Sequence, residues 1–362
     1  MIEWKTYRYT EIADLIGGGT PKTSEPLYWD GDIPWLSVKD FVGDSKYVFS
    51  TEKHITKLGL ENSSTKLLQK DDIIISARGT VGEMAMIPFP MSFNQSCFGL
   101  RANGDLVDPH FLYYYTKTKV KELKGNSHGS VFDTITRATF DNIICLLPSL
   151  EEQRRIAGIL GAIDDKIENN RRINTNLELQ AQALFDKIFF DDKDVERNPL
   201  SDYTNINPTR TLRQGVVARY IEMANLPTKG SFPSDWSYKS YGGGCKFANG
   251  DTIMARITPC LENGKTAYID FLEEQEVAFG STEYIVISAK SGYCPALFYF
   301  LARNKEFVDY AVGHMNGSSG RQRVGGVDIA NFPMPHITLE DSNKFAEIAM
   351  PIMDVIRNNS LE

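Results

Sequence analysis

The chain has 362 residues, of which 42% are hydrophobic and 24% charged, values that are ordinary for a globular protein able to bury sizeable cores. Its formal net charge of −8 argues against DNA binding when taken alone, because neutralising phosphates needs lysine and arginine. Since a basic groove can exist on an otherwise acidic surface, composition neither supports nor excludes a nucleic-acid partner. The length predicts two or three domains.

The N-terminus and the cysteines indicate a cytoplasmic protein. Residues 1–5 carry charge and lead into no apolar run, so we expect neither a signal peptide nor a membrane span. The five cysteines lie far apart without a CxxC pair, which is typical of free thiols in a reducing compartment; they are Cys97, Cys145, Cys245, Cys260 and Cys294. Histidines are few and isolated, so we expect no metal site.

The first part of the chain predicts a mixed α+β domain over residues 1–148. An isoleucine-rich run between Asp72 and Arg78 predicts a buried strand, and a helix is expected from Pro109 onward. Acidic pairs such as Asp71-Asp72 and Glu273-Glu274 are interpreted as solvated loop charges. Strand order is left open.

The clearest helix lies in a spacer over residues 149–190. Ser149 can cap it, with Glu152 three residues later as in a capping box. At about 1.5 Å per residue the helix would be roughly 60 Å long, which suits a spacer. In a seven-residue frame the first core position reads Ile156, Ile163, Asn170, Leu177 and Leu184. Asn170 either fixes register and partner choice or merely lies at the edge of the seam.

The second half of the chain repeats the first. Charged, aperiodic residues after the spacer mark a boundary, and a second α+β domain is expected over residues 200–337. Its predicted strand, Asp251–Arg256, corresponds to the run Asp72–Arg78 with a shift of close to 179 positions along the sequence. Its predicted helix begins at Pro295. Each half is therefore expected to be a globular domain followed by a helix.

A second helix over residues 338–362 repeats the spacer with a shift of about 189 positions. The expected helix-pairing residues are Ile156, Ile163, Asn170, Leu177, Ile352 and Asn359. The distal half of this second helix is absent, and the sequence leaves open whether the chain is truncated or naturally lacks that end.

Three motifs stand in the order found in one known family. The segment IGGGTPK at residues 16–22, with YW at 28–29 and GDIPWL at 31–36, is similar to the opening of a target-recognition domain. LPSLEEQRRIAGIL at residues 147–160 looks like a central conserved region, and ARITPCLENGK at 255–265 is similar to a form common in a second such domain. Over essentially its whole length the chain resembles the specificity subunits of type I restriction-modification systems, and it departs from them at the C-terminus, where a conserved helix normally continues.

The resemblance implies a fold and a set of partners. Two target-recognition domains would each read one half of a bipartite, asymmetric site on double-stranded DNA. Two conserved helices would pair as an antiparallel coiled coil that sets the unread gap between the half-sites. They would also carry methyltransferase subunits, which use S-adenosylmethionine, and a nuclease-translocase subunit, which uses ATP and magnesium. The chain itself would bind no cofactor.

Catalytic motifs are missing from the sequence, which predicts a non-catalytic binder. The fragments closest to a base-methyltransferase loop, Asn198-Pro199-Leu200 and Asn207-Pro208-Thr209, lack its second proline and its aromatic residue. Gly264-Lys265-Thr266 ends like a phosphate-binding loop, but the glycine required five positions earlier is Pro259. The triplet at residues 17–19 is explained by turn chemistry.

Loop residues near glycines are the candidates for contacting DNA, because base edges are read by arginine, lysine and amide side chains while hydroxyls grip phosphate. In the first domain they are Lys22, Arg78, Thr80, Ser130 and Arg137. In the second they are Arg256, Lys265, Ser318, Ser319, Arg321 and Arg323, with residues 317–323 as the most basic and flexible segment.

Three other functions remain open at this point. The chain could be a self-contained nuclease or methyltransferase, against which the missing motifs argue. It could be a coiled-coil scaffold whose domains bind proteins, a reading that the acidic total supports. It could also be the targeting subunit of a related system whose nuclease and methyltransferase are fused, which only the partner composition distinguishes.

Overall fold

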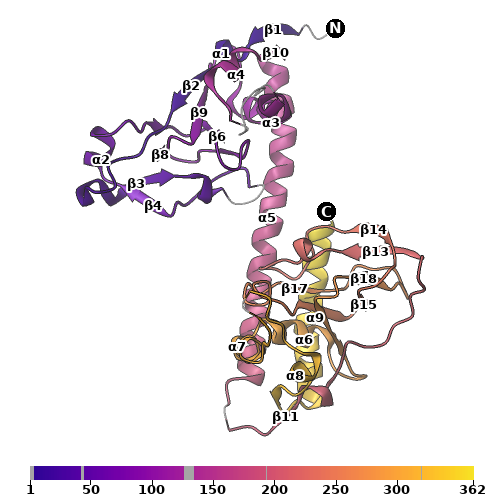
Figure 1. Cartoon of the computed structure of the whole chain (residues 1–362). Coiled ribbons are helices and arrows are strands. Elements are labelled where there is room, and N and C mark those ends of the chain that lie inside the picture. Colours follow the sequence, from indigo (N-terminus) through magenta and orange to yellow (C-terminus); the bar gives the residue numbers. More distant parts are fainter. Residues whose placement is uncertain (1–3, 42–44, 126–133, 193, 319) are drawn as a thin grey trace. The chain divides into compact units, whose positions relative to one another are not determined.

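The computed structural model describes residues 4–41, 45–125, 134–192, 194–318 and 320–362. The chain divides into two compact units, Met1–Glu168 and Asn169–Glu362. Each unit combines β-sheets with helices (Figure 1), so the predicted α+β class is confirmed. Among the helices of the described ranges, none is long and apolar enough to cross a membrane.

The first unit contains two four-stranded sheets and a two-stranded ribbon (Figure 1). One sheet is fully antiparallel, in the order β2 (Ala13–Gly17), β9 (Cys97–Ala102), β6 (Ile73–Ser76), β7 (Met84–Met86). The other has the order β4 (Lys53–Ile55), β3 (Trp29–Leu36), β8 (Met91–Phe93), β5 (Leu67–Leu68), with β3 and β8 parallel. The ribbon joins β1 (Lys5–Arg8) to β10 (Ile144–Leu147). The helices are α1 (Tyr9–Ile12), α2 (Lys57–Glu61), α3 (Pro109–Gly125), α4 (Arg137–Asp141) and α5 (Leu150–Phe189), with short 3-10 turns at Pro26–Tyr28 and Val38–Asp40.

Strand β6 shows why its sequence is apolar without alternation. Ile73 and Ile75 pack into one core, with residues of α1, α3 and α4 and Ala157 of α5. Ile74 points the other way, into a second core shared with the β4-β3-β8-β5 sheet. Successive side chains of a strand face opposite sides, so a strand that is covered on both sides must be apolar throughout. The unit is therefore built as a helical layer and two sheets.

The second unit repeats this strand order, with every strand number raised by ten. Its sheets run β12 (Thr204–Ile206), β19 (Tyr284–Ala289), β16 (Asp251–Ala255), β17 (Thr266–Tyr268) and β14 (Ser237–Ser240), β13 (Val217–Ile221), β18 (Ala278–Gly280), β15 (Cys245–Phe247). Its ribbon joins β11 (Arg197–Pro199) to β20 (Pro333–Pro335). Its helices are α6 (Pro295–Arg303), α7 (Lys305–Gly313), α8 (Gly326–Ala330) and α9 (Leu339–Leu361), with 3-10 turns at Leu200–Asp202 and Met223–Asn225. The sequence repeat therefore reflects two copies of one topology.

Hydrogen bonds fix the correspondence between the two copies. The Ile87 N–H donates to the Asp72 carbonyl at 2.8 Å, as the Ile269 N–H does to that of Asp251 at 2.9 Å. Further along, the Ala77 N–H donates to Ser96 at 2.8 Å and the Arg256 N–H donates to Glu283 at 3.0 Å. Arg256 thus corresponds to Ala77, in agreement with the shift of 179 positions between the two predicted strands.

The interpretation of Asp72 as a solvated loop charge was also wrong. Its side chain is 5% exposed and pairs with Arg101 at 2.6 Å, while it accepts the Gln69 N–H at 2.7 Å. Asp251 is 1% exposed, pairs with Arg210 at 2.5 Å and accepts the Ala248 N–H at 2.8 Å. Each aspartate closes the turn before the central strand, and a carboxylate buried there needs both the cation and the backbone donor.

In the second unit the end of α5 packs against α9. The Phe185 and Phe345 rings lie 5.9 Å apart. The Asn359 amide donates to Asn174 Oδ1 at 2.8 Å, and the Asn170 amide donates to the Asn359 carbonyl at 3.4 Å. Residues later in α5 contact residues earlier in α9, so the two helices run antiparallel here. The predicted spacer helix and second helix are both confirmed, to within a residue or two of their expected starts.

Asp270, which follows β17, makes the stability of the second unit depend on pH. Burial raises the pKa of its carboxyl from the usual 3.8 to about 7; the Arg357 guanidinium of α9 opposes this, and the Asp354 carboxylate adds to it. The folded state therefore keeps this proton to a higher pH than the unfolded chain does. The contribution of Asp270 to stability is then least favourable above pH 7 and improves as the pH falls toward 4.

Replacing Asp270 with asparagine should raise the free energy of unfolding at pH 8 by on the order of 1–3 kcal/mol, because a neutral side chain does not lose solvation of a charge on burial. At pH 4, where the folded carboxyl is already protonated, the substitution should change little. Urea unfolding of both proteins at pH 8, 6 and 4 measures this, and an effect of equal size at all three pH values would contradict it.

Candidate nucleic-acid interface

Four connecting segments of the first unit lie against one another. They are residues 18–22 between β2 and β3, 77–82 between β6 and β7, 94–96 between β8 and β9, and 134–137 before α4. The Gly19 N–H donates to Phe93 at 2.9 Å, the Ala77 N–H to Ser96 at 2.8 Å, and the Ile135 N–H to Ala77 at 3.1 Å. We call these four segments the first loop cluster.

Glycines allow the first of these segments to approach its neighbours closely. A Cβ on Gly18 would lie 2.1 Å from the Asn94 carbonyl oxygen, and one on Gly19 would lie 2.2 Å from Ser64 Oγ. The Trp35 indole donates to the Gly19 carbonyl at 3.0 Å. The glycine triplet and the IPWL motif therefore serve the packing of this loop, and turn chemistry alone was an incomplete explanation.

The predicted residues of the first domain fall on this cluster, apart from Ser130, which lies outside the described residues. Lys22, Arg78 and Thr80 are exposed. Arg137 is exposed too, but one of its guanidinium nitrogens donates to the Leu15 carbonyl at 2.5 Å, so it also ties α4 to β2.

Sequence reasoning missed Gln95, an exposed amide on the 94–96 segment, whose surroundings are hydrogen-bonded both to the segment of Lys22 and to that of Arg78. The Thr20 hydroxyl donates to its side-chain carbonyl and so orients it. An oriented glutamine amide can read adenine, because it both accepts and donates on one edge. The polar triplet Asn94-Gln95-Ser96 between two apolar runs was the signal that could have revealed it.

The second unit assembles the corresponding segments, which we call the second loop cluster. They are residues 207–216, 256–265, 281–283, and 316–318 with 320–325. The Val324 N–H donates to Arg256 at 3.0 Å, as Ile135 does to Ala77 in the first cluster, and the Thr258 N–H donates to Gln322 at 3.0 Å. The ARITP motif and the basic segment at residues 317–323 are thus neighbours.

The candidate DNA-contacting residues of the second domain differ in their exposure and in their hydrogen bonds. Ser318 and Arg321 are exposed, and Ser319 lies outside the described residues. Arg256 is half-buried, and its Nε has no hydrogen-bond partner within the described part of the chain. Lys265 donates its ammonium to the Met223 carbonyl at 2.7 Å, so this lysine is tied to a neighbouring turn.

Arg323 forms a fork with Glu283 across the second loop cluster. Its Nε lies 2.9 and 2.8 Å from the two carboxylate oxygens, and its Nη2 lies 2.7 Å from one of them. Its Nη1 donates to the Arg321 carbonyl at 3.0 Å. The hydrogen bonds from Arg323 hold the pKa of the Glu283 carboxyl below its usual range, so the pair stays ionised and the carboxylate is neutralised in place.

The expected helix-pairing residues fall in three different environments. Asn170 and Asn359 are hydrogen-bonded to each other's helices, and Leu177 and Ile352 pack against the core of the second unit. Ile156 packs against the core of the first unit. Ile163 is 52% exposed, beside Ile159 and Ile167 at 53% and 41%.

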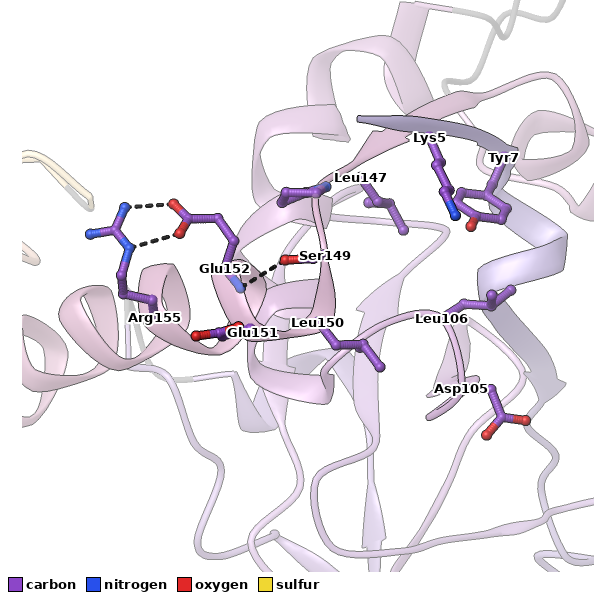
Figure 2. Close-up of a pocket in the computed structure, with 11 residues that line it drawn as sticks. Lys5, Tyr7, Asp105, Leu106, Leu147, Ser149, Leu150, Glu151, Glu152 and Arg155 are labelled. Atoms are coloured by element: carbon purple, nitrogen blue, oxygen red, sulfur yellow. Dashed lines mark hydrogen bonds and ion pairs between the residues drawn. The ribbon is translucent and has the colours of Figure 1, made fainter. Parts of the chain in front are cut away.

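A hollow of about 690 Å³ lies between the β1–β10 ribbon and the start of α5 (Figure 2). Its charged lining includes Lys5, Asp105 and Glu151, with Glu152 and Arg155 paired to each other at 2.5 Å. The Glu152 N–H donates to Ser149 Oγ at 3.4 Å, so the predicted cap is present, while the Glu152 carboxylate turns to Arg155 (Figure 2). Among the described residues that line the hollow, the aspartate and glutamate side chains outnumber the lysine and arginine side chains, and the hollow is therefore unsuited to a phosphate backbone.

Comparison with known proteins decides the family. The sequence model of the type I restriction modification DNA specificity domain matches residues 1–179. Residues 1–179 are a type I restriction-modification DNA specificity domain. The family resemblance predicted from the sequence is thereby confirmed for residues 1–179.

Individual relatives of the specificity domain point the same way. The chain is similar to the MjaIX type I restriction enzyme specificity subunit of Methanocaldococcus jannaschii, with 32% identity over 191 residues, 52% of this chain and 44% of that protein. It is also similar to the HindI specificity subunit of Haemophilus influenzae, with 33% identity over 176 residues, 46% of this chain and 38% of that protein. The match therefore spans less than half the length of each of these two relatives.

A solved structure extends the likeness of fold beyond the specificity domain. The S subunit of a type I restriction-modification system from M. genitalium superposes with a TM-score of 0.63, covering 99% of this chain and 91% of that one at 13% identity. This likeness concerns the fold alone, and it includes the second unit.

Proposed function

We propose that this chain is the DNA-specificity subunit of a type I restriction-modification complex and has no catalysis of its own. Each unit would read one half of a bipartite site through its loop cluster. The proposal rests on one observation. Two units of the same topology bring corresponding loops together, and these loops carry different side chains. The first cluster offers Lys22, Arg78 and Gln95, and the second offers Arg256, Arg321 and Arg323. Unlike side chains at like positions favour unlike half-sites, and hence an asymmetric site.

The acidic net charge is compatible with this proposal. Exposed cations stand on the loops while carboxylates nearby are paired, as Glu283 is with Arg323. A local basic surface of this kind is what phosphate contact requires, whatever the charge of the rest of the chain.

Helix α5 would act as the spacer between the half-sites. It has 40 residues, about 60 Å, and runs from the first unit into the second. We infer that α5 and α9 form part of an antiparallel coiled coil. The face of α5 that packs on α9 continues toward the N-terminus as the exposed residues Ile159, Ile163 and Ile167. A second helix packed on these three isoleucines would bury them. The coiled coil would then be longer than the part that α5 forms with α9.

Methyltransferase and nuclease-translocase subunits are the proposed partners. They would supply S-adenosylmethionine, ATP and magnesium chemistry, and the complex would act in the cytoplasm, where its DNA is. Within the ranges that the structure describes, no group of three or more histidine, cysteine, aspartate or glutamate side chains could hold a metal ion. The role proposed for this chain needs none.

Single-molecule sequencing of DNA from cells that carry this chain with its neighbouring methyltransferase tests the proposal. We expect methylation at a bipartite, asymmetric motif that disappears when the gene for this chain is deleted. Methylation that persists unchanged after the deletion would contradict the role in specificity. A symmetric motif would contradict the reading of different half-sites by the two units.

A further inference from the structure

The fork between Arg323 and Glu283 leaves part of the guanidinium unused. A guanidinium has five N–H groups. The Glu283 carboxylate takes the Nε proton and one from Nη2, and the Arg321 carbonyl takes one from Nη1. With respect to the residues that the structure describes, two N–H groups remain without an acceptor, one on each terminal nitrogen, and the Arg323 side chain is 40% exposed. The two terminal nitrogens of a guanidinium can donate parallel hydrogen bonds from the end that faces away from Nε.

The backbone under Arg323 is held as firmly as its side chain. Arg323 and Asn316 exchange two N–H···O=C bonds of 2.9 Å, and Arg323 also bridges to Ile257 across the cluster. A side chain fixed at both ends loses little conformational entropy when it binds, which favours its use in recognition. The neighbouring Arg321 is exposed, and no carboxylate among the described residues forms an ion pair with it.

We propose that Arg323, oriented by Glu283, reads a guanine in the half-site bound by the second unit. Guanine presents two acceptors, O6 and N7, on its major-groove edge, and two parallel donors from one arginine match them. Glu283 is a positioning residue: it fixes the plane of the guanidinium and compensates its positive charge. This inference rests on the proposed function, because it names the base that one of the two loop clusters recognises.

The alternative is an ion pair that merely ties residues 281–283 to residues 316–325. Such a pair would also link the loops, but it would carry no information about a base. The two roles are separated by a change in base preference at a single position, since loss of a structural tie would weaken binding to all sequences alike.

The test uses the full chain and a pool of duplex DNA with randomised positions, from which bound duplexes are recovered and sequenced. Wild-type protein should enrich a motif with guanine at one position of one half-site. In Arg323→Lys, which keeps the charge but not the fork, guanine preference at that position should fall by about 5- to 150-fold while the rest of the motif stays. Glu283→Gln should reduce the same preference by a smaller factor, and at no other position.

Arg197→Lys and Glu306→Gln are the matched controls, because this arginine–glutamate pair joins β11 to α7 and lies outside the second loop cluster. Both variants should leave the motif and the affinity for DNA unchanged. Thermal unfolding of each variant shows that it is folded, and Arg323→Gln serves as a second variant should the lysine substitution unfold the cluster. If the preference for guanine is unchanged in both Arg323→Lys and Arg323→Gln, the inference about Arg323 is wrong and the proposed function stands. Failure of the wild type to enrich any sequence would contradict the proposed function itself.

Discussion

Replacing Arg303 with alanine should lower the free energy of unfolding of the second unit by about 3–5 kcal/mol. Arg303, near the end of α6, joins several loops at once. Its guanidinium donates to the carbonyls of Thr228 at 2.8 Å, Gly264 at 2.7 Å, Gly230 at 2.6 Å and Thr266 at 3.0 Å, and to the Tyr299 hydroxyl at 3.2 Å. Alanine would leave these acceptors unpaired in a partly buried site, which costs more than the bonds contribute net.

Hydrogen exchange measured peptide by peptide distinguishes the two units in this experiment. Strands β16 and β19 should lose protection in Arg303→Ala, whereas β6 and β9 of the first unit should keep theirs. Arg303→Lys is the control, because an ammonium keeps the charge but reaches fewer of the carbonyls, and its effect should be smaller. A loss below about 1 kcal/mol, or an equal loss in both units, would contradict this account of Arg303.

Inserting one helical turn into α5 should lengthen the unread DNA gap by roughly two base pairs and leave both half-sites unchanged. Four residues add about 6 Å to a helix, and base pairs are stacked about 3.4 Å apart. The insertion belongs after Glu168. Residues 165–168 are exposed, whereas a turn added near Asn176 would displace Asn174 and Leu177 from their contacts with α9.

The motif methylated by the lengthened protein measures the gap directly. Substituting Lys166 and Glu168 by alanine without an insertion provides a control for local disturbance, and its motif should match that of the wild type. A gap of unaltered length in the lengthened protein would contradict the role of α5 as a ruler.

Periodic burial is the part of this fold that the sequence predicts well. The spacer was expected over residues 149–190, and its helix runs Leu150–Phe189, because apolar residues recur at helical spacing along it. The two isoleucine-rich strands were found for a similar reason, since β6 and β16 are covered on both faces. The two strands also occupy the same position in corresponding sheets, because both units have one topology.

Side-chain pairing is the part that the sequence did not predict. Asp72 and Asp251 occupy the same position in the two copies, yet Arg101 pairs with the first from strand β9, and Arg210 pairs with the second from the loop after β12. Arg323 meets Glu283, forty positions away, because two loops are brought together by backbone bonds that no local pattern encodes. The hydrogen bond from Lys265 to the Met223 carbonyl was equally beyond what the sequence predicts.

Exchanging the first domain for that of another family member tests most directly whether the two units read separate half-sites. The junction between residues 148 and 149 lies between β10 and α5, but Gln153 donates to the Leu106 carbonyl at 3.0 Å and Asp164 accepts from Tyr114 at 2.6 Å, so the incoming domain should provide both partners. Sequencing of the methylated motif should then show one half-site replaced and the other unchanged. Alteration of both half-sites, or of neither, would contradict independent reading by the two units.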